Sequence, residues 1–278
     1  MIGINEKLSI LYYDGVSTYT DYSLDLFDYA SDSVSLTLAN TESIYIGFRK
    51  PINTFYVQMD TYSTTDTSLS VKYYNGSSFV AVTGLHDETR AFQKSGFVIF
   101  DRNLASEAKT TINSTELYWY ELSVAADTSA SVFRGINIVY SSDADLKTEV
   151  FEISDYFPNG ENSFILSHAA ARNEIIQKLR TDGRYKLDFS TGVAKDITAF
   201  DLLDVSQVRV ASTYLVLSKI YSNLSDETDD VYSQKSDRYK SMYNAAMQHF
   251  FLWLDTDDDG TLDIEERTQD VSGVIQRR

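Results

Sequence analysis

The sequence predicts an α+β protein of two domains, an N-terminal antiparallel β-sandwich that is jelly-roll-like and a C-terminal helical bundle with an EF-hand-like loop. Two changes along the chain carry this prediction. Residues 8–153 contain short aromatic and β-branched stretches that alternate with a period of two. From residue 163 onward, apolar residues recur at helical spacing. With 278 residues, 43% of them hydrophobic, the chain is long enough for two packed cores.

The N-terminal domain, expected at residues 1–157, reads as a series of at least seven short strands, which is typical of a sandwich. Asn75 and Gly76 can adopt the positive φ of a tight hairpin turn. Because strand side chains alternate, Trp119 is expected on the opposite face from Tyr118 and Tyr120. The clearest candidate strands occupy 42–49, 53–60, 69–76, 95–102, 116–124 and 133–141.

The domain boundary is expected in the segment FPNGEN, at residues 157–162, which joins one of only two prolines to a glycine and two asparagines. The helical domain follows at 163–266, and residues 267–278 form a C-terminal docking tail. No repeat of 20 to 50 residues is visible in the sequence. The chain therefore divides into two different architectures in sequence.

Three helices of about 17 to 25 residues are expected in the second domain. The first begins near Ser163 and stops at residues 181–183. The second begins near Asp204 and is expected to lie centrally, because it carries apolar residues on two faces. The third runs from about Asp229 to Leu254. The two faces of the second helix comprise Val210, Tyr214, Leu217 and Tyr221 on one side and Val208, Ala211 and Leu215 on the other.

Charge and composition exclude several classes of function. The 41 acidic and 24 basic residues give a net charge of -17, which disfavours a nucleic-acid reader that neutralises phosphates with broad Lys/Arg surfaces. No export signal is visible and no apolar run approaches the roughly 18 residues of a membrane helix, so no membrane partner is expected. The absence of cysteine removes disulfides, thiolate catalysis and Cys-based zinc sites.

The stretch DTDDDGTLDIEE, residues 255–266, has the spacing of a calcium-binding loop. Calcium takes six to eight hard oxygen ligands, and positions one, three, five, seven, nine and twelve of such a loop supply them. Gly260 stands at the sixth position, where the chain turns sharply. The predicted ligands are Asp255, Asp257, Asp259, Thr261 through its carbonyl, Asp263 and Glu266.

This calcium is expected to be structural. Sensor loops come in pairs, and the chain has no second loop of this kind. Only residues 267–278 follow Glu266, and they read as a short extended tail rather than an outgoing helix. We therefore expect a clamp that turns the chain out of the third helix. The alternative is a solvated acidic turn that binds calcium weakly or not at all.

The sequence offers little for catalysis. His86, His168 and His249 are the only histidines, and no G-x-S-x-G nucleophile elbow or phosphate-binding glycine motif occurs. His168 and His249, on helices, are expected to be packed or capping residues. His86 stands beside Asp87 and Glu88, where hydrogen bonding within the turn is expected and a role as a metal or acid/base partner is the alternative. A glycosidase remains a third option, since 41 acids always supply some carboxylate pair.

Tyrosines on the predicted sandwich could stack on sugar rings, as in carbohydrate-binding modules. The alternative is that large aromatic residues fill the sandwich core or a subunit interface. The tyrosines considered for the exposed face are Tyr62, Tyr73, Tyr74 and Tyr120.

The helical half resembles the core of head-tail connector proteins of tailed bacteriophages, also called adaptors or head-completion proteins. The resemblance lies in residues 201–250, where a helix centred on Ala211, Tyr214 and Leu217 precedes an Asp/Ser turn and a helix with Tyr239 and Tyr243. These motifs encode packing rather than chemistry, and the resemblance covers about residues 163–278.

The β half resembles a sandwich module common in phage virion proteins. Residues 44–124 follow the module's order, from IYIGF through the hairpin YYNGSSF and the SGF strand to LYWYELSV. Phe79 stands where tryptophan is more usual in that module. The chain departs from compact connectors, which often consist of the helical half alone.

The resemblance implies a virion protein of the neck, made in the host cytoplasm. It implies a homo-oligomeric ring of about twelve copies beneath the portal protein, in contact with tail or neck proteins. The helices would line a channel through which DNA passes without sequence-specific binding, which suits an acidic subunit. The tail would dock on the portal through Val271, Val274, Ile275, Arg277 and Arg278. The runner-up is a calcium-dependent carbohydrate-binding or adhesion protein of the tail or baseplate.

Overall fold

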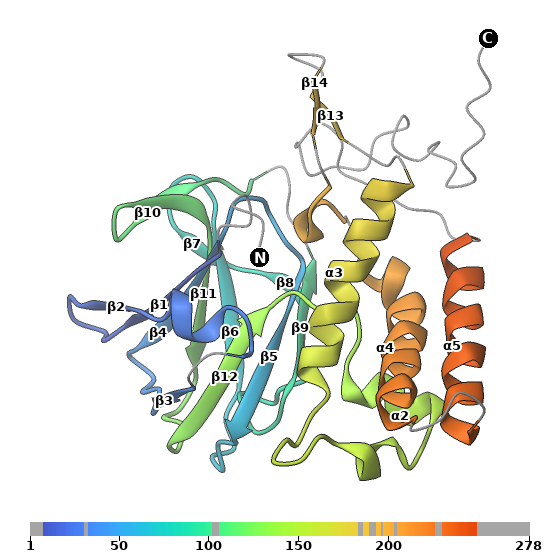
Figure 1. The fold of residues 1–278 in the computed structure, drawn as a ribbon. Helices are drawn as coiled ribbons and strands as arrows, with labels where there is room; N and C mark the ends of the chain where they lie inside the picture. The colour runs from blue at the N-terminus through green and yellow to red at the C-terminus, as the bar shows by residue number, and fades with distance from the viewer. Residues whose placement is uncertain are drawn as a thin grey trace. The chain divides into compact units, whose positions relative to one another are not determined.

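The computed structural model describes residues 8–30, 33–101, 106–182, 186–188, 193–195, 197–202, 205–225 and 230–248. The chain forms two compact units, Met1–Ile138 and Val139–Arg278, which are described separately. The first contains two antiparallel sheets and the second is mainly helical, so the α+β class is confirmed (Figure 1). The first unit ends at Ile138, before the expected boundary at 157–162. Residues 139–156 belong to the second unit because they pack with the helices that follow them.

The larger sheet of the first unit has seven strands in the order β2-β1-β4-β11-β6-β7, with β10 paired to β11. Every pairing is antiparallel. The longest strand, β11, lies at the centre between β4 and β6. The strands are β1 (Leu8–Tyr13), β2 (Tyr19–Asp21), β4 (Ser43–Phe48), β6 (Leu69–Tyr74), β7 (Phe79–Ala81), β10 (Thr110–Ile112) and β11 (Thr115–Val124).

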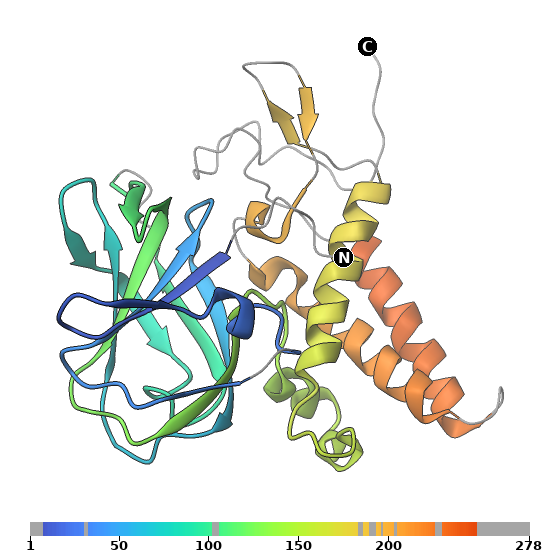
Figure 2. The ribbon, with the colours of Figure 1, turned by 60° about the vertical axis from the view of Figure 1, so that its left-hand side comes forward.

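The smaller sheet has five strands in the order β3-β12-β5-β9-β8, again all antiparallel. From β4 to β12 the chain repeatedly crosses from one sheet to the other, so central neighbours such as β4 and β11, or β5 and β12, are distant in sequence (Figure 2). A short helix, α1 (Ser23–Leu26), precedes β3. The strands are β3 (Val34–Leu36), β5 (Thr54–Thr61), β8 (Thr83–Asp87), β9 (Gly96–Asp101) and β12 (Ser131–Asn137).

The two sheets share an aromatic and aliphatic core. Register pairs Tyr120 with Ile46 and Trp119 with Gly47, so Tyr120 and Trp119 point to opposite faces, as the alternation predicted. Tyr120 is fully buried, and its ring centroid lies 5.3 Å from that of Phe100 on the smaller sheet. The inner face of the larger sheet therefore carries Tyr118 and Tyr120, and Trp119 belongs to the outer face.

The turn after β8 has an unusual backbone. Arg90, Ala91 and Phe92 all have positive φ, at 52°, 52° and 70°, although none is glycine. The carboxylate of Asp87 holds this turn, because it accepts hydrogen bonds from the backbone and hydroxyl of Thr89 (2.8 and 2.6 Å) and from the backbone of Ala91 (2.7 Å). Phe92 is fully buried and fixes the end of the turn in the core.

The second unit contains the three long helices that the sequence predicted: α3 (Ile165–Thr181), α4 (Arg209–Leu224) and α5 (Val231–Gln248). Helix α4 packs against both α3 and α5, which confirms the central position expected from its two apolar faces. It begins later than the predicted Asp204, after a 3-10 turn, η3 (Val205–Val208). The predicted extension of the third helix beyond Gln248 lies outside the described residues.

Shorter elements complete the helical unit. Helix α2 (Asp143–Glu149) and the 3-10 turn η1 (Ile153–Tyr156) precede α3. A hairpin of β13 (Lys186–Asp188) and β14 (Val193–Lys195), followed by η2 (Ala199–Asp201), separates α3 from α4 in sequence. Among the described residues, no helix combines the length and the apolar character needed to cross a membrane.

Candidate functional site

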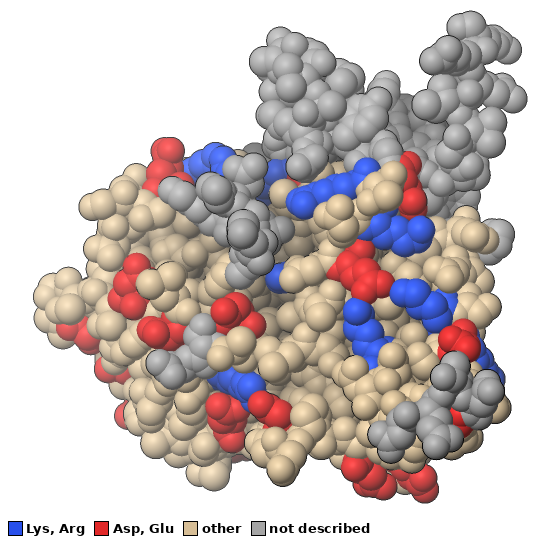
Figure 3. Space-filling view, viewed as in Figure 1, with Lys and Arg blue, Asp and Glu red and all other residues tan. Residues whose placement is uncertain are grey.

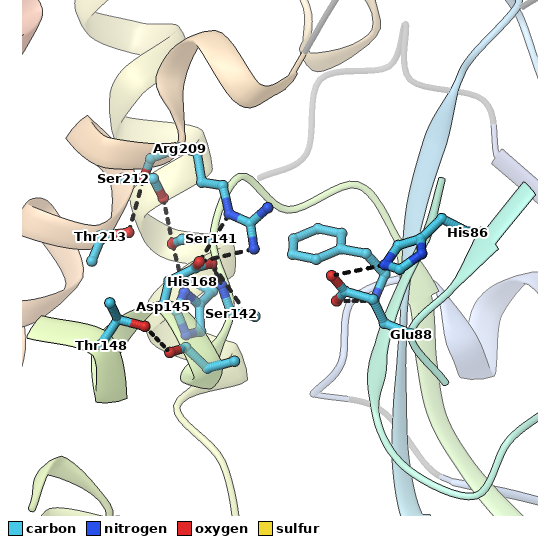
Figure 4. Close-up of polar contacts among 12 residues, drawn as sticks. His86, Glu88, Ser141, Ser142, Asp145, Thr148, His168, Arg209, Ser212 and Thr213 are labelled. Atoms are coloured by element: carbon cyan, nitrogen blue, oxygen red, sulfur yellow. Dashed lines mark hydrogen bonds and ion pairs between the residues drawn. The ribbon is translucent and has the colours of Figure 1, made fainter. Parts of the chain in front are cut away.

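A buried polar cluster joins α2, α3 and α4 in the second unit. The hydroxyl of Ser141 lies 2.8 Å from Nδ1 of His168 and 2.8 Å from the hydroxyl of Ser212. On the other side of the ring, Nε2 of His168 lies 3.2 Å from Oδ1 of Asp143. Figure 4 shows Ser141 between His168 and Ser212. A serine, a histidine and an aspartate that are distant in sequence thus meet in one chain of hydrogen bonds.

The histidine nitrogens in this cluster contact different partners from those in a hydrolytic triad. In such a triad the aspartate contacts Nδ1 and the serine contacts Nε2, whereas here the two partners are exchanged. An ionised Asp143 can only accept a hydrogen bond, so Nε2 of His168 donates to it and Nδ1 faces the serine hydroxyl. Ser141 is 0% exposed, and a substrate carbonyl therefore has no access to its oxygen. This geometry suits a clamp between helices.

Burial of Asp143 opposes ionisation, but hydrogen bonding and charge from His168 outweigh it, so the pKa of Asp143 lies below its ordinary value. Oδ1 of Asp143 also accepts a hydrogen bond from the backbone of Phe164 (3.1 Å), immediately before α3. The carboxylate therefore positions the start of α3 as well as the histidine ring.

A second carboxylate anchors the start of α4 to α2. Oδ2 of Asp145 accepts hydrogen bonds from the backbone and hydroxyl of Ser142 at the start of α2 (2.8 and 3.1 Å). Oδ1 of the same residue contacts two guanidinium nitrogens of Arg209, at 2.9 and 2.8 Å (Figure 4). Together with the histidine cluster, these contacts hold the segment before α3 on the helices.

Ion pairs also connect the three long helices. Glu174 on α3 contacts Nζ of Lys219 on α4 (2.6 Å) and Nζ of Lys240 on α5 (2.9 Å). Burial opposes the charge of Glu174, and the two lysines more than offset it, so its pKa is lowered. Figure 3 shows Lys and Arg interspersed with Asp and Glu on this unit. The basic side chains are thus partly neutralised locally and form no broad phosphate-binding surface in this view.

A stack of tyrosines, which we call the tyrosine face, lies on the α4 and α5 side of the second unit. Tyr221 stacks on Tyr239 (ring centroids 5.8 Å apart, planes at 9°) and on Tyr232 (6.2 Å, 17°). Tyr214 lies 6.2 Å from Tyr239, and Tyr156 of η1 lies edge-on to Tyr232 at 6.0 Å. Tyr221 is buried, and burial raises its pKa to about 12, whereas the other four rings are half-buried.

Exposed apolar residues adjoin the tyrosine face in sequence. Val210 is 57% exposed and stands one turn before Tyr214 on the same side of α4. Val231, 58% exposed, precedes Tyr232 at the start of α5. Phe151, 90% exposed, lies between α2 and η1. Of these three residues, Val210 shares one side of α4 with Tyr214, and an exposed apolar side chain next to half-buried rings suits a surface that another protein covers.

A second aromatic surface, which we call the outer aromatic face, occupies the larger sheet on the side away from its core. Its floor is buried and consists of Leu11, Tyr45, Ile112, Leu117 and Trp119. Trp119 is buried because the β10–β11 hairpin folds Ile112 into this floor and because Gly47 leaves room beneath the indole. A Cβ at position 47 would lie 2.8 Å from the Trp119 ring and 2.7 Å from Leu117.

Half-buried rings stand around this floor. Tyr13 and Tyr19 pair across β1 and β2 with ring centroids 4.9 Å apart. Phe79 lies 5.5 Å from the ring of Tyr45 and 5.6 Å from that of Tyr74. Strands β4 and β7 are separated by β11 and β6, about 14 Å in backbone spacing. The rings of Tyr45 and Phe79 must therefore lean toward each other across the sheet.

A charged pair lies among these rings. Nζ of Lys72 is 2.7 Å from Oε1 of Glu121, and the hydroxyl of Tyr45 donates to Oε2 at 3.2 Å. Burial raises the pKa of Tyr45, and the charge of Glu121 adds to this effect. Burial likewise raises the pKa of Tyr19. The phenols are thus neutral hydrogen-bonding groups beside an internally neutralised charge pair.

The predicted site residues fall in different places. The calcium loop at 255–266, the docking tail at 267–278 and His249 lie outside the described residues. His168 is 1% exposed, which confirms that it is a packed histidine. His86 lies on β8 rather than in a loop; its side chain is 70% exposed and its Nε2 is 3.9 Å from Glu88 (Figure 4). Within the described residues, no group of three His, Asp or Glu side chains could hold a metal.

Two of the four tyrosines considered for an exposed sandwich face are not exposed. Tyr73 and Tyr120 are 7% and 0% exposed, because register places both on the inner face of the larger sheet. Tyr62 is 42% exposed, and Tyr74 belongs to the outer aromatic face. Sequence reasoning missed Tyr13, Tyr19 and Phe79, although their alternation with residues of the inner face was a usable signal.

Comparisons with known proteins assign no family. No protein-family model matches the chain, and searches of curated proteins and of solved structures give no match. Function must therefore be inferred from the residues and their arrangement.

Proposed function

We propose that this chain is a structural protein of a phage virion, a head-tail connector that assembles as a ring at the portal vertex. The observation that carries the proposal is the tyrosine face, with the exposed Val210 one turn before Tyr214. Half-buried rings and exposed apolar side chains on a helical unit suit burial against a neighbouring copy. The helices that bear this face are those in which the sequence resembles connectors.

The arrangement of the helical unit supports a passive role. The side chains of Ser141, His168 and Asp143 hydrogen-bond to one another and form an internal clamp. A clamped bundle can transmit force between neighbouring copies without catalysing a reaction. Proteins bind DNA tightly when Lys and Arg side chains neutralise phosphates and release counterions. A subunit with a net charge of -17 would release few counterions, so DNA could pass the channel wall without binding to it. In this proposal the two-sheet unit is a jelly-roll-like β-sandwich that lies outside the ring.

The C-terminal segment completes the proposal. Residues 267–278 would dock on the portal protein through Val271, Val274 and Ile275, with Arg277 and Arg278 facing acidic groups of the partner. Calcium held by Asp255–Glu266 would fix the direction in which this tail leaves the helices. Ring, portal contact and virion location all belong to the same proposal.

Assembly of the purified full chain tests it. Size-exclusion chromatography with light scattering, and electron microscopy alone and with the portal protein of the same phage, should show a ring with the symmetry of the portal. If the chain neither forms nor joins such a ring, the proposal is wrong.

A pair of matched variants tests the tyrosine face itself. Val210→Asp places a charge in the proposed interface and should abolish ring formation, since an unpaired charge is costly to bury. Leu24→Asp changes a residue of the first unit that is 87% exposed and should leave the ring intact. A ring that tolerates Val210→Asp as well as Leu24→Asp would show that this face is not the interface between copies.

A further inference from the structure

The outer aromatic face combines three features that the proposed ring does not use. Its rings Tyr13, Tyr19, Tyr74 and Phe79 are half-buried, so each presents part of its surface to solvent. Its floor, with Trp119 and Tyr45, is buried and closely packed, which holds these rings in place. Polar atoms of Lys72, Glu121 and the tyrosine hydroxyls lie among the rings.

We propose that the outer aromatic face is a binding site for a neutral glycan. Pyranose rings present apolar C–H faces that pack on aromatic rings and edges lined with hydroxyls that need hydrogen-bond partners. The face offers both within one patch. This inference is independent of the proposed ring, because none of its residues belongs to the helical unit.

The charge pair decides which class of ligand fits. Lys72 and Glu121 are 2.7 Å apart and neutralise each other, so neither a phosphate nor a cationic ligand finds an unpaired opposite charge there. A purely apolar partner would have to cover the pair and desolvate it; the Lys72 side chain is still 35% exposed. A hydroxyl-rich neutral ligand can accept from the ammonium group and donate to the carboxylate without separating them.

The preformed packing favours binding of a rigid face. Tyr19 contacts both Tyr13 and Tyr45, and Phe79 contacts both Tyr45 and Tyr74. The rings are thus held in place before a ligand binds, so binding orders fewer side chains and loses less conformational entropy. The described residues of this face include no group of His, Asp or Glu side chains that could hold a metal, so recognition is expected to be independent of calcium.

Binding of defined oligosaccharides to the full chain tests the proposal. An array should include neutral hexose and N-acetylhexosamine oligosaccharides together with sialylated and uronate-containing ones, and calorimetry should follow with cellohexaose, maltohexaose and chitohexaose. We expect at least one neutral oligosaccharide to bind with a Kd of about 1 mM or tighter, equally in calcium and in chelator. The proposal would be overturned if no neutral glycan binds, if only anionic glycans bind, or if chelator abolishes binding.

Variants assign the binding to this face. Tyr19→Ala and Phe79→Ala should each weaken it about tenfold, whereas Tyr19→Phe should retain most of it, because the ring rather than the hydroxyl makes the stacking contact. Tyr62→Ala removes an exposed tyrosine outside the face and serves as the matched control. Thermal unfolding of each variant checks that the fold is retained, and binding unaffected in folded Tyr19→Ala and Phe79→Ala proteins would refute the assignment.

Discussion

Substitution of Ser141 by alanine tests the clamp between α2, α3 and α4. It removes two 2.8 Å hydrogen bonds and leaves Nδ1 of His168 and the hydroxyl of Ser212 without this partner, in a site where all three residues are at most 1% exposed. A buried polar group deprived of its partner costs about 1–3 kcal/mol. We therefore expect Ser141→Ala to lower the free energy of unfolding by about 2 kcal/mol.

A double-mutant cycle separates the hydrogen bond from general packing. Once Ser141 is alanine, the further change Ser212→Ala removes a hydroxyl that has already lost this partner, so the double variant should cost about 1 kcal/mol less than the sum of the two single changes. Thr148→Ala is the control, because its hydroxyl is exposed and bonds only within α2 (3.1 Å). It should change stability by at most about 0.5 kcal/mol.

Urea unfolding followed by helical circular dichroism, at fixed protein concentration and neutral pH, measures all four proteins. The reasoning is refuted if Ser141→Ala is no more destabilising than Thr148→Ala. Strict additivity of the two serine substitutions would show that their hydroxyls do not act as a unit.

Three further predictions concern other parts of the chain. Because the folded pKa of Asp143 is lowered, its stabilisation is complete at neutral pH and is lost as the pH falls below about 4, so the difference in unfolding free energy from Asp143→Asn should shrink there; a constant difference would contradict this. Gly47→Ala should destabilise the first unit by about 1–3 kcal/mol and alter the near-ultraviolet circular dichroism of Trp119, and an unchanged spectrum would argue against the close approach. Asp255→Ala and Glu266→Ala should each weaken calcium binding in calorimetric titrations, and an intact chain that binds no calcium at millimolar concentration would rule out the site.

The sequence predicted the helices better than the long-range contacts that they make. The two apolar faces of α4 are a local pattern, and they correctly placed it between α3 and α5. The expected boundary at 157–162 lies after the division that follows Ile138, because the apolar run after β12 reads as more strand, whereas Ser141 reaches His168, 27 residues further along the chain. Such a pairing leaves no periodic signal.

The outer aromatic face likewise depends on contacts between strands that are distant in sequence and that local patterns do not predict. Alternation separates Trp119 from its tyrosine neighbours but does not say which face is inside. That choice depends on register between β11, β4 and β6, which come from distant parts of the sequence. The floor that buries Trp119 further requires the β10–β11 hairpin and the absence of a side chain at Gly47. Calcium binding by residues 255–266 stays a prediction.

The left-handed turn at Arg90, Ala91 and Phe92 gives an independent means of adjusting the stability of the first unit. A non-glycine residue at positive φ costs about 1–2 kcal/mol, and here the backbone is held by Asp87 rather than by the exposed side chain of Arg90. Glycine at position 90 would relieve that cost while leaving every ring of the outer aromatic face and every helix unchanged. The stability of the first unit can therefore be adjusted at position 90 without altering the residues that form the outer aromatic face.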